Sequence, residues 1–280
     1  APGAHRIRLR AKHFVLAAGS IGTPSILLSS GAPDPHRVTG KRTFLHPTVV
    51  SGAMFAQKVE GYYGAPQSIY SDHFLDLLPV DGPVGFKLEA PPVHPILAGI
   101  TLPGFGTDHA AWMKRFPNLQ VLIALVRDGF HPESVGGQVV LKSRWPVLDY
   151  PISDYVWNGV RRAYLAMAEI QFAAGAQTVM PLHEGAIPVT SWRDAKAAIE
   201  GLPMRALHSR VVSAHVMGGC AMGNDARTAV VTEAGRHHQL ANLSVHDGSV
   251  FPTSLGANPQ LTIYAIAGRM AANLAQSLKA

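Results

Sequence analysis

The stretch SVHDGSVFPTSLGANPQLTIYAIAGRM, residues 244–270, combines a strand end, a loop and a helix start near the C-terminus. The strand-like run 243–246 stops at Asp247-Gly248, a pair typical of a tight turn. Asn258 precedes Pro259, which predicts a helix start, because Asn caps helices and Pro suits the first helical position. One short segment therefore supplies a carboxylate, an amide and the positive end of a helix dipole.

Both polar residues of this segment have a functional and a structural interpretation. Asp247 can accept hydrogen bonds from ligand hydroxyls, or it can end its strand in an Asx turn with Gly248. Asn258 can orient a reacting atom, or it can serve only as the cap of the last helix. Local sequence leaves both interpretations open.

Composition restricts the class of protein. Of 280 residues, 47% are hydrophobic and 15% are charged, which is typical of a folded chain with one large or two modest domains. The net charge is +6, and basic residues gather at 5–13, yet no dense basic run alternates with aromatics, so a mildly basic enzyme is favoured over a nucleic-acid or membrane-surface binder. The single Cys220 excludes an internal disulfide and leaves the compartment open.

The chain divides into three parts: residues 1–45, residues 46–212, which are rich in Pro and Gly, and residues 213–280. A long helix is expected over 154–175, capped by Asp154, because apolar residues recur there at helical spacing. Strand-like runs occur at 7–9, 14–16, 84–88, 119–126 and 137–142. No run has the length and hydropathy of a membrane span.

A strand-to-helix joint, AAGSIGTPSILLSSG, covers residues 17–31. Gly19 and Gly22 allow the backbone to approach a ligand or another strand. We expect Ser20 or Thr23 to cap the helix, Pro24 to lie in its first turn and Gly31 to end it. The chain has no G-x-G-x-x-G, so this joint is not a diphosphate-binding fingerprint.

A second glycine-rich segment, SAHVMGGCAMGND, covers residues 213–225. His215 is followed by small residues that leave it open to a substrate, so it can act as a base near neutral pH or be a structural histidine. Cys220 can be a nucleophile, although an inert buried thiol is favoured. Despite 14 histidines, including the neighbours His237 and His238, no metal site is predicted, because no carboxylate or thiol completes a ligand spacing.

These motifs, together with FLHPTVV at 44–50, resemble in order and spacing those of the glucose–methanol–choline (GMC) oxidoreductases, with some similarity to the cholesterol oxidase branch. The resemblance implies an FAD-dependent enzyme that oxidises CH–OH groups. It implies an α/β plus α+β fold, in which 1–45 and 213–280 form part of a Rossmann-like FAD-binding domain. Residues 46–212 would form a substrate-binding domain built mostly on an antiparallel sheet.

The resemblance also implies roles for individual residues. His215 would be the general base, or its helper, taking the hydroxyl proton of an alcohol as hydride leaves for flavin N5, and Asn258 would orient the substrate oxygen. His46, in the His-Pro of FLHPTVV, is expected to be a loop histidine. The cofactor-binding residues implied are Asp247 and Gly248 at the ribityl and diphosphate region, Pro259 and Gln260 near the pyrimidine end of the flavin, and Gly19 and Thr23 along the FAD.

Two departures from the family pattern modify this expectation. The usual GTCRMG is GGCAMG at 218–223, so a Thr and an Arg are replaced. Without a diphosphate fingerprint, the chain is expected to be the C-terminal portion of a longer enzyme that is inactive alone. The alternative is a non-catalytic module with a flavin-enzyme fold.

The substrate is expected to be a small alcohol, and the electron acceptor is not specified. Apolar residues of the middle part suggest a hydrophobic alcohol, although core packing is favoured for them: Phe74, Leu75, Leu77, Leu78, Phe86, Leu97 and Ile100.

Overall fold

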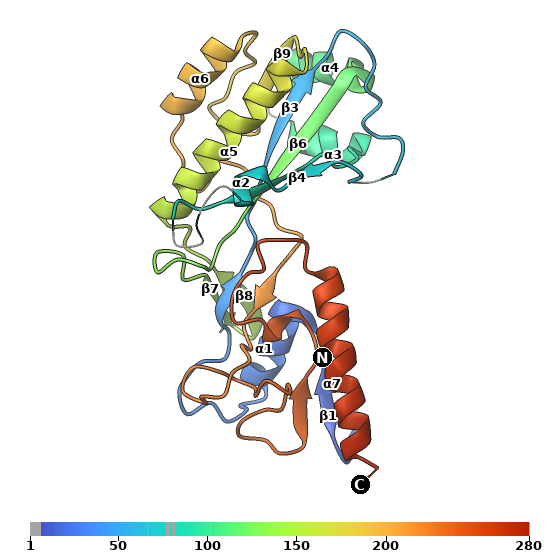
Figure 1. Ribbon diagram of the computed structural model, residues 1–280, viewed down its shortest axis with the longest axis vertical. Coiled ribbons are helices and arrows are strands. Elements are labelled where there is room, and N and C mark those ends of the chain that lie inside the picture. Colours follow the sequence, from blue (N-terminus) through green and yellow to red (C-terminus); the bar gives the residue numbers. More distant parts are fainter. Residues whose placement is uncertain (1–6, 66, 77–78, 80–81, 103, 280) are drawn as a thin grey trace.

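The computed structural model describes residues 7–65, 67–76, 79, 82–102 and 104–279. The chain forms two lobes, one above the other in Figure 1, and passes between them several times. The upper lobe contains a five-stranded sheet and most of the helices. The lower lobe contains both ends of the described chain.

The five-stranded sheet is antiparallel, in the order β4 (Tyr70–Ser71), β5 (Phe86–Glu89), β6 (Leu119–Val126), β3 (Thr48–Met54) and β9 (Thr178–Pro181). Its longest pairing joins β3 to β6, with Val49 opposite Ala124. The long helix α5 (Asp154–Ala173) crosses one face (Figure 1), because an apolar stripe with Val160, Tyr164 and Met167 packs into the main core there.

The other face of this sheet is covered only in part. Short helices α3 (Pro95–Thr101) and α4 (Gly106–Lys114) pack there with Met54, Leu119 and Met180. The remaining elements of this lobe are the short helix α2 (His73–Asp76), the 3-10 turn η1 (Phe116–Asn118) and α6 (Trp192–Gly201), which packs on α5.

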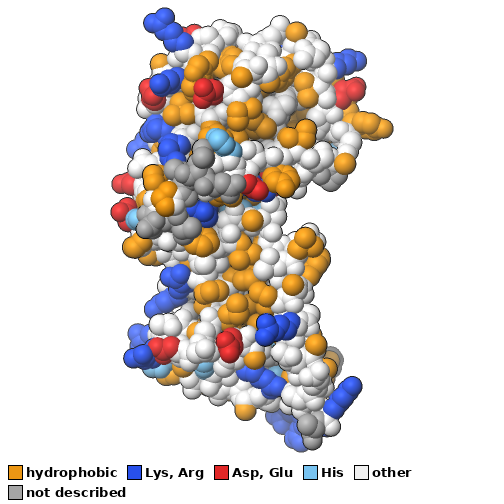
Figure 2. Space-filling view, in the orientation of Figure 1, with side chains coloured by type: hydrophobic (Ala, Val, Ile, Leu, Met, Phe, Trp, Pro, Cys, Tyr) orange, Lys and Arg blue, Asp and Glu red, His pale blue; other side chains and the backbone are white. Residues whose placement is uncertain are grey.

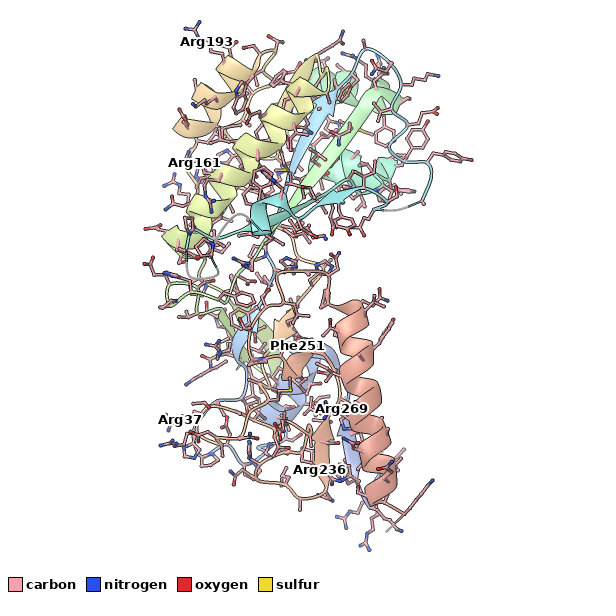
Figure 3. All side chains as sticks on the ribbon, viewed as in Figure 1. Arg37, Arg161, Arg193, Arg236, Phe251 and Arg269 are labelled. Atoms are coloured by element: carbon pink, nitrogen blue, oxygen red, sulfur yellow. The ribbon has the colours of Figure 1, made fainter. Side chains whose placement is uncertain are left out.

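The lower lobe joins segments from both ends of the chain. Strand β1 (Phe14–Leu16) pairs in parallel with β11 (Leu243–Val245), and α7 (Gln260–Ser277) lies beside them (Figure 1). A four-stranded sheet has the order β10 (Met217–Gly218), β2 (Lys41–Phe44), β7 (Gly137–Lys142) and β8 (Trp145–Asp149). Helix α1 (Gly19–Ser29) and the 3-10 turn η2 (Gly248–Val250) contact each other, and buried Phe251, labelled in Figure 3, directly follows η2.

Most of the expected elements are present, and four details were wrong. The run 7–9 is not a strand, since it has no neighbouring strand among the described residues and leaves Ile7 82% exposed. Helix α1 begins at Gly19 with Ala18 as its cap residue, so neither Ser20 nor Thr23 caps it and Pro24 lies inside. The cap of α5 is Ser153, whose hydroxyl accepts from the N–H of Val156.

The fold is therefore mixed α/β with two antiparallel sheets and one short parallel pair. Gly31 ends α1 as expected, with a φ of +62°. The hairpin of β7 and β8, from the middle of the chain, packs with α1 in the lower lobe and not on the five-stranded sheet. Among the described residues, no helix is both long enough and apolar enough to cross a membrane.

Candidate functional site

His215 lies between the lobes, in the segment that leads into β10. Its backbone N–H donates to the hydroxyl of Ser213 at 3.4 Å, and that hydroxyl donates to the carbonyl of Leu45. The ring is half-buried and borders a cavity of about 410 Å³. Segments far apart in sequence thus hold the histidine in the wall of a cavity.

The cavity is strongly apolar. It lies against the partly covered face of the five-stranded sheet, and its walls include Val50, Pro92, Leu97, Val121, Ile123, Leu125 and Leu182. Of the other lining residues, Arg210 is already paired, because it donates to Glu184 at 2.9 Å and to the carbonyl of Thr101 at 2.6 Å. His215 is therefore the lining side chain that can exchange a proton near neutral pH.

Figure 2 shows that the molecule narrows between the lobes and that hydrophobic side chains lie on the surface there. Of the apolar residues singled out in the sequence, Phe74 and Phe86 pack in or against the main core, as favoured, while Leu97 lines the cavity. Leu77 and Leu78 lie outside the described residues.

The ring of a second histidine, His46, contacts the ring of His215. The Nδ1 atoms of His46 and His215 are 3.1 Å apart, and the two rings stack with centroids 5.2 Å apart. His46 is fully buried, and its Nε2 has no hydrogen-bond partner among the described residues. Burial, His215 and Lys87 together lower the pKa of His46 to about 3, and burial also lowers the pKa of His215, against the effect of Glu89. Both rings are therefore neutral at pH 7.

The backbone at His46 is fixed by a buried carboxylate. His46 has a φ of +50°, which is uncommon for a residue other than glycine. Asp128 accepts from the N–H of His46 at 3.1 Å, from the N–H of Leu45 at 3.0 Å and from the hydroxyl of Tyr150 at 2.5 Å. Burial raises the pKa of Asp128, and these donors oppose that effect. Nothing in the local sequence indicates this support, because only the fold brings Asp128 to His46.

Asp247 connects the two ends of the chain. One carboxylate oxygen accepts from the N–H of Gly19 at 2.9 Å and from the hydroxyl of Thr23 at 2.5 Å, both in α1. The other accepts from the N–H of Ser249 at 2.7 Å, which is the Asx turn that the sequence allowed. Gly248 lies where a Cβ would meet Ile263 at 3.1 Å, so it permits close packing against α7.

The remaining predicted site residues lie at the start of α7. Asn258 and Gln260 are exposed and Pro259 is buried. The expectation that Asn258 caps the helix was wrong: Pro259 is the cap residue, because proline disfavours helical geometry in the residue before it and the helix starts one residue later. The loop that leads to Asn258 is tied to the histidine pair, since the hydroxyl of Ser254 bonds to Asp128.

The structure therefore brings four separate motifs together. The hydroxyl of Ser20 donates to the carbonyl of Val216, and the N–H of Cys220 donates to the carbonyl of Ser249. Cys220 is fully buried, and burial raises the pKa of its thiol, so the favoured inert thiol is what the structure contains. In the described part of the chain, no group of three or more His, Cys, Asp or Glu side chains could hold a metal.

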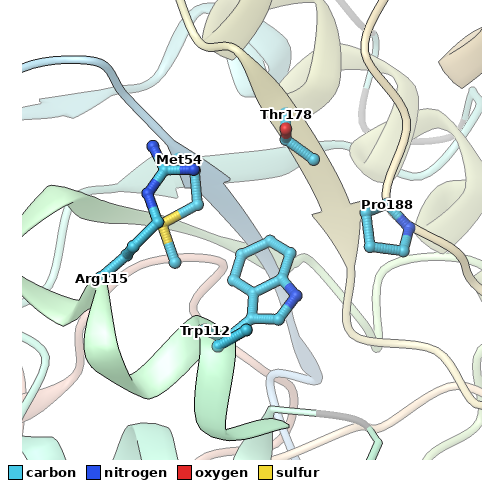
Figure 4. A pocket seen from close by; sticks show the side chains of 6 residues that line it. Met54, Trp112, Arg115, Thr178 and Pro188 are labelled. Atoms are coloured by element: carbon cyan, nitrogen blue, oxygen red, sulfur yellow. The ribbon is translucent and has the colours of Figure 1, made fainter. Parts of the chain in front are cut away.

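A second hollow in the upper lobe is bordered by Met54, Trp112, Arg115, Thr178 and Pro188 (Figure 4). Arg115 is engaged there with the carbonyl of Phe55 and the amide of Gln177. No lining residue of this hollow can act as a base near neutral pH.

The chain is similar in sequence to known proteins. Family models described as GMC oxidoreductase match residues 1–48 and 132–267. A GMC-type oxidoreductase of Mycobacterium tuberculosis is 29% identical over 95% of this chain and 40% of its own length. A long-chain-alcohol oxidase of Arabidopsis thaliana is 26% identical over 95% of this chain and 37% of its own.

A solved structure shares the fold. Formate oxidase of Aspergillus oryzae, in an R554K variant studied for its FAD modification, superposes with a TM-score of 0.64 at 16% identity, over 92% of this chain and 53% of that one. The chain spans about half of that enzyme and less than half of the two relatives.

Proposed function

Because the chain belongs to the GMC oxidoreductase family, whose cofactor is FAD and whose members are oxidoreductases acting on alcohols and similar substrates, we propose that it oxidises the CH–OH group of a small apolar alcohol. The observation that carries the proposal is the position of His215, a neutral imidazole that lines an apolar cavity of about 410 Å³. The long-chain-alcohol oxidase among the relatives supports an aliphatic substrate.

FAD fits the residues that are present. The first three N–H groups of α7 have no intrahelical partner, because its first helical hydrogen bond runs from Ile263 to Pro259, and Asn258 and Gln260 are exposed beside them. At the start of α1, Gly19 has a φ of +75°, and a Cβ there would meet nothing within 4 Å. Both helix starts thus leave room for a ligand.

We assign the cofactor contacts accordingly. Pro259 and Gln260 would hold the flavin at the start of α7, where the positive end of the helix dipole stabilises negative charge. The backbone at Gly19 would line the FAD, while Asp247 and Thr23 act by fixing that backbone through their hydrogen bonds. Gly248 would contribute by letting the two helix starts approach. When bound, FAD supplies the hydride acceptor.

The chain's own residues do the acid–base and orienting work. His215 accepts the proton of the substrate hydroxyl, which its lowered pKa permits by keeping the imidazole unprotonated at neutral pH. Asn258 donates a hydrogen bond to the same oxygen and fixes its direction. The apolar walls exclude water and hold the carbon chain of the alcohol.

In this proposal, different parts of the chain bind the cofactor and the substrate. The segments 1–45 and 213–280, joined by the hairpin of β7 and β8, would form the FAD-binding side, in a Rossmann-like arrangement of which β1 and β11 are two strands. The rest of 46–212 would form the substrate side. Since the chain spans less than half of its relatives, we propose that further flavin-binding residues outside these 280 complete the cofactor site.

The test is flavin reduction under anaerobic conditions in the FAD-loaded enzyme that contains these residues. Linear primary alcohols of increasing length should bleach the flavin absorbance, with kcat/KM rising as the chain fills the cavity. A yellow protein that no alcohol bleaches would favour the alternative of a non-catalytic module with a flavin-enzyme fold.

A further inference from the structure

We propose that His46 is a positioning residue, which fixes the hydrogen of the His215 ring on Nδ1 and so leaves the Nε2 of His215 free to accept a proton. The proposal rests on the role of His215 as the base in the proposed function. It assigns a task to the buried histidine that the sequence indicated only as part of a loop.

The contact between the two rings permits a single arrangement of charge. At 3.1 Å between the Nδ1 atoms, one hydrogen lies between them, because two N–H groups would collide and two lone pairs would repel. One ring therefore donates and the other accepts. Which ring donates decides the state of the opposite nitrogen on each, since a neutral imidazole carries one hydrogen.

The proposed role of His215 as the base decides which ring donates the hydrogen bond between the two Nδ1 atoms. If His46 donated, His215 would carry its hydrogen on Nε2 and could not accept a proton there. If His215 donates from Nδ1, its Nε2 has a free lone pair, and His46 carries its own hydrogen on Nε2. That atom of His46 is buried and has no partner among the described residues, so no contact there selects either tautomer.

The pair does not pass the proton further. When His215 accepts a proton on Nε2, relay would require Nδ1–H to move to His46 and make it cationic. Burial and the nearby Lys87 oppose a charged His46, whose pKa is lowered to about 3. The positive charge therefore stays on His215, where Glu89 stabilises it. In this step one O–H bond breaks and one N–H bond forms, with the hydrogen between the rings unmoved.

The surroundings hold His46 for this task. Its left-handed backbone is kept by Asp128, which Tyr150 and Leu45 also contact. The charged and titratable groups that face the pair from the packed elements are Lys87 and Glu89 of β5 and Asp128 after β6. Lys87 is itself paired with Asp72 at 2.9 Å.

The tautomers can be read directly, without flavin or substrate. Two-bond ¹⁵N–¹H spectra of the histidine-labelled 280-residue chain at pH 8 distinguish protonated from bare ring nitrogens, with His46→Asn and His215→Asn used for assignment. We expect hydrogen on Nδ1 of His215 and on Nε2 of His46. Hydrogen on Nε2 of His215 and on Nδ1 of His46 would overturn the proposal.

Kinetics of the FAD-loaded enzyme provide a second readout. His46→Asn places an amide oxygen near the position of Nδ1 and keeps an acceptor, whereas His46→Leu removes it. We expect His46→Leu to lower kcat by about 10–100-fold at an unchanged flavin content, the range for residues that orient a histidine, and His46→Asn to recover most of that loss. Equal losses in both variants would show that packing alone matters and would overturn the proposal.

A matched control separates positioning from stability. His237 is also a buried histidine and lies in the lower lobe, where its Nδ1 accepts from the N–H of Gln239. His237→Leu should lower the thermal midpoint without moving the acid limb of the kcat/KM profile, while His46→Leu should move it. A failure of the proposed function would give a different result. His215→Ala would then turn over normally, while the unsubstituted chain would still show the predicted ring tautomers.

Discussion

The hydroxyl of Thr23 donates a 2.5 Å hydrogen bond to the carboxylate of Asp247, although 224 residues separate them. The same oxygen accepts from the N–H of Gly19, so one side chain of the C-terminal segment closes the first turn of α1. A family resemblance assigns Asp247 to the cofactor, and the structure gives it three protein donors. In the proposed function, Asp247 therefore contributes to cofactor binding through the backbone that it holds.

Asp247→Asn should lower the free energy of unfolding by about 1–3 kcal/mol. The reason is that one carboxylate oxygen becomes an NH₂ group, which cannot accept the hydrogen bonds that Asp247 now accepts. Thr23→Val should lower the free energy of unfolding as well. The loss of unfolding free energy in the double variant should be smaller than the sum of the two single losses by roughly 0.5–3 kcal/mol, the range for directly contacting residues. Urea unfolding of the four proteins measures this, with Asp225→Asn, an exposed Asp paired to Arg227, as a control that should change stability far less. If the losses of the two single variants were strictly additive in the double variant, the hydrogen bond between Thr23 and Asp247 would be contradicted.

The buried His46 predicts a specific dependence of stability on pH. Its pKa is about 3 in the folded chain and ordinarily 6.5, so between these values the unfolded chain binds a proton that the folded chain does not. Stability from this group is complete above pH 6.5 and is lost as the pH falls towards 3, at about 1.4 kcal/mol per pH unit.

His46→Asn removes this titration, so its free energy of unfolding should fall less steeply below pH 6.5. Urea unfolding of both proteins from pH 8 to pH 5 provides the comparison, and the contribution of histidines that do not contact His46 cancels in the difference. Parallel curves would show that His46 is protonated in the folded chain.

Local sequence predicted the elements that have strong periodicity or clear end signals. The apolar run 119–126 became β6, the helical spacing after Asp154 became α5, and Gly31 ended α1. The missed features depend on contacts across the chain. Strand β3 pairs with β6 and β9, which nothing in its own residues specifies, and Pro24 is tolerated inside α1, where Thr23 and Gly19 bind Asp247.

The site was predictable to a similar extent. The small residues after His215 indicated an accessible histidine, and the structure places it at the cavity. The partner ring of His46 could not be found from spacing, because 169 residues separate the two histidines and Asp128 supports His46 from the segment after β6. The prediction that Asn258 caps α7 was wrong, because proline disfavours helical geometry in the residue before it and this outweighed the capping preference of Asn.

The cavity predicts a change of chain-length preference on substitution of Val121, which lines it from β6. Val121→Phe should fill part of the hollow and lower kcat/KM for long alcohols relative to short ones by about 10–200-fold, the range for a methylene-scale mismatch. Val121→Ala should shift the preference towards longer or branched alcohols. Steady-state kinetics over an alcohol series measure both, and an unchanged preference in the two variants would place the substrate elsewhere.

His215→Ala in the FAD-loaded enzyme should lower the rate of anaerobic flavin reduction by roughly 10²–10⁴-fold, the usual contribution of a general base. The matched control is His238→Gln, because His238 is also half-buried but bonds to the carbonyl of Gly223, away from the cavity. Near-normal reduction in His215→Ala would reject the assignment of the base.

Asn258 allows catalysis and stability to be separated, because the structure removes the capping role that would otherwise confuse them. Pro259 is the cap residue of α7, and Asn258 is exposed, so Asn258→Ala should leave the free energy of unfolding within about 0.5 kcal/mol, as at ordinary surface positions. If the proposed roles hold, turnover should fall, because the amide proposed to orient the substrate oxygen is lost, but by less than in His215→Ala, which loses the proposed proton acceptor. Asn258→Asp is the matched control for size, because its carboxylate cannot donate to that oxygen and should not restore turnover. A large loss of stability in Asn258→Ala, with turnover falling only in proportion to the folded fraction, would assign the residue to the helix start and remove it from the chemistry.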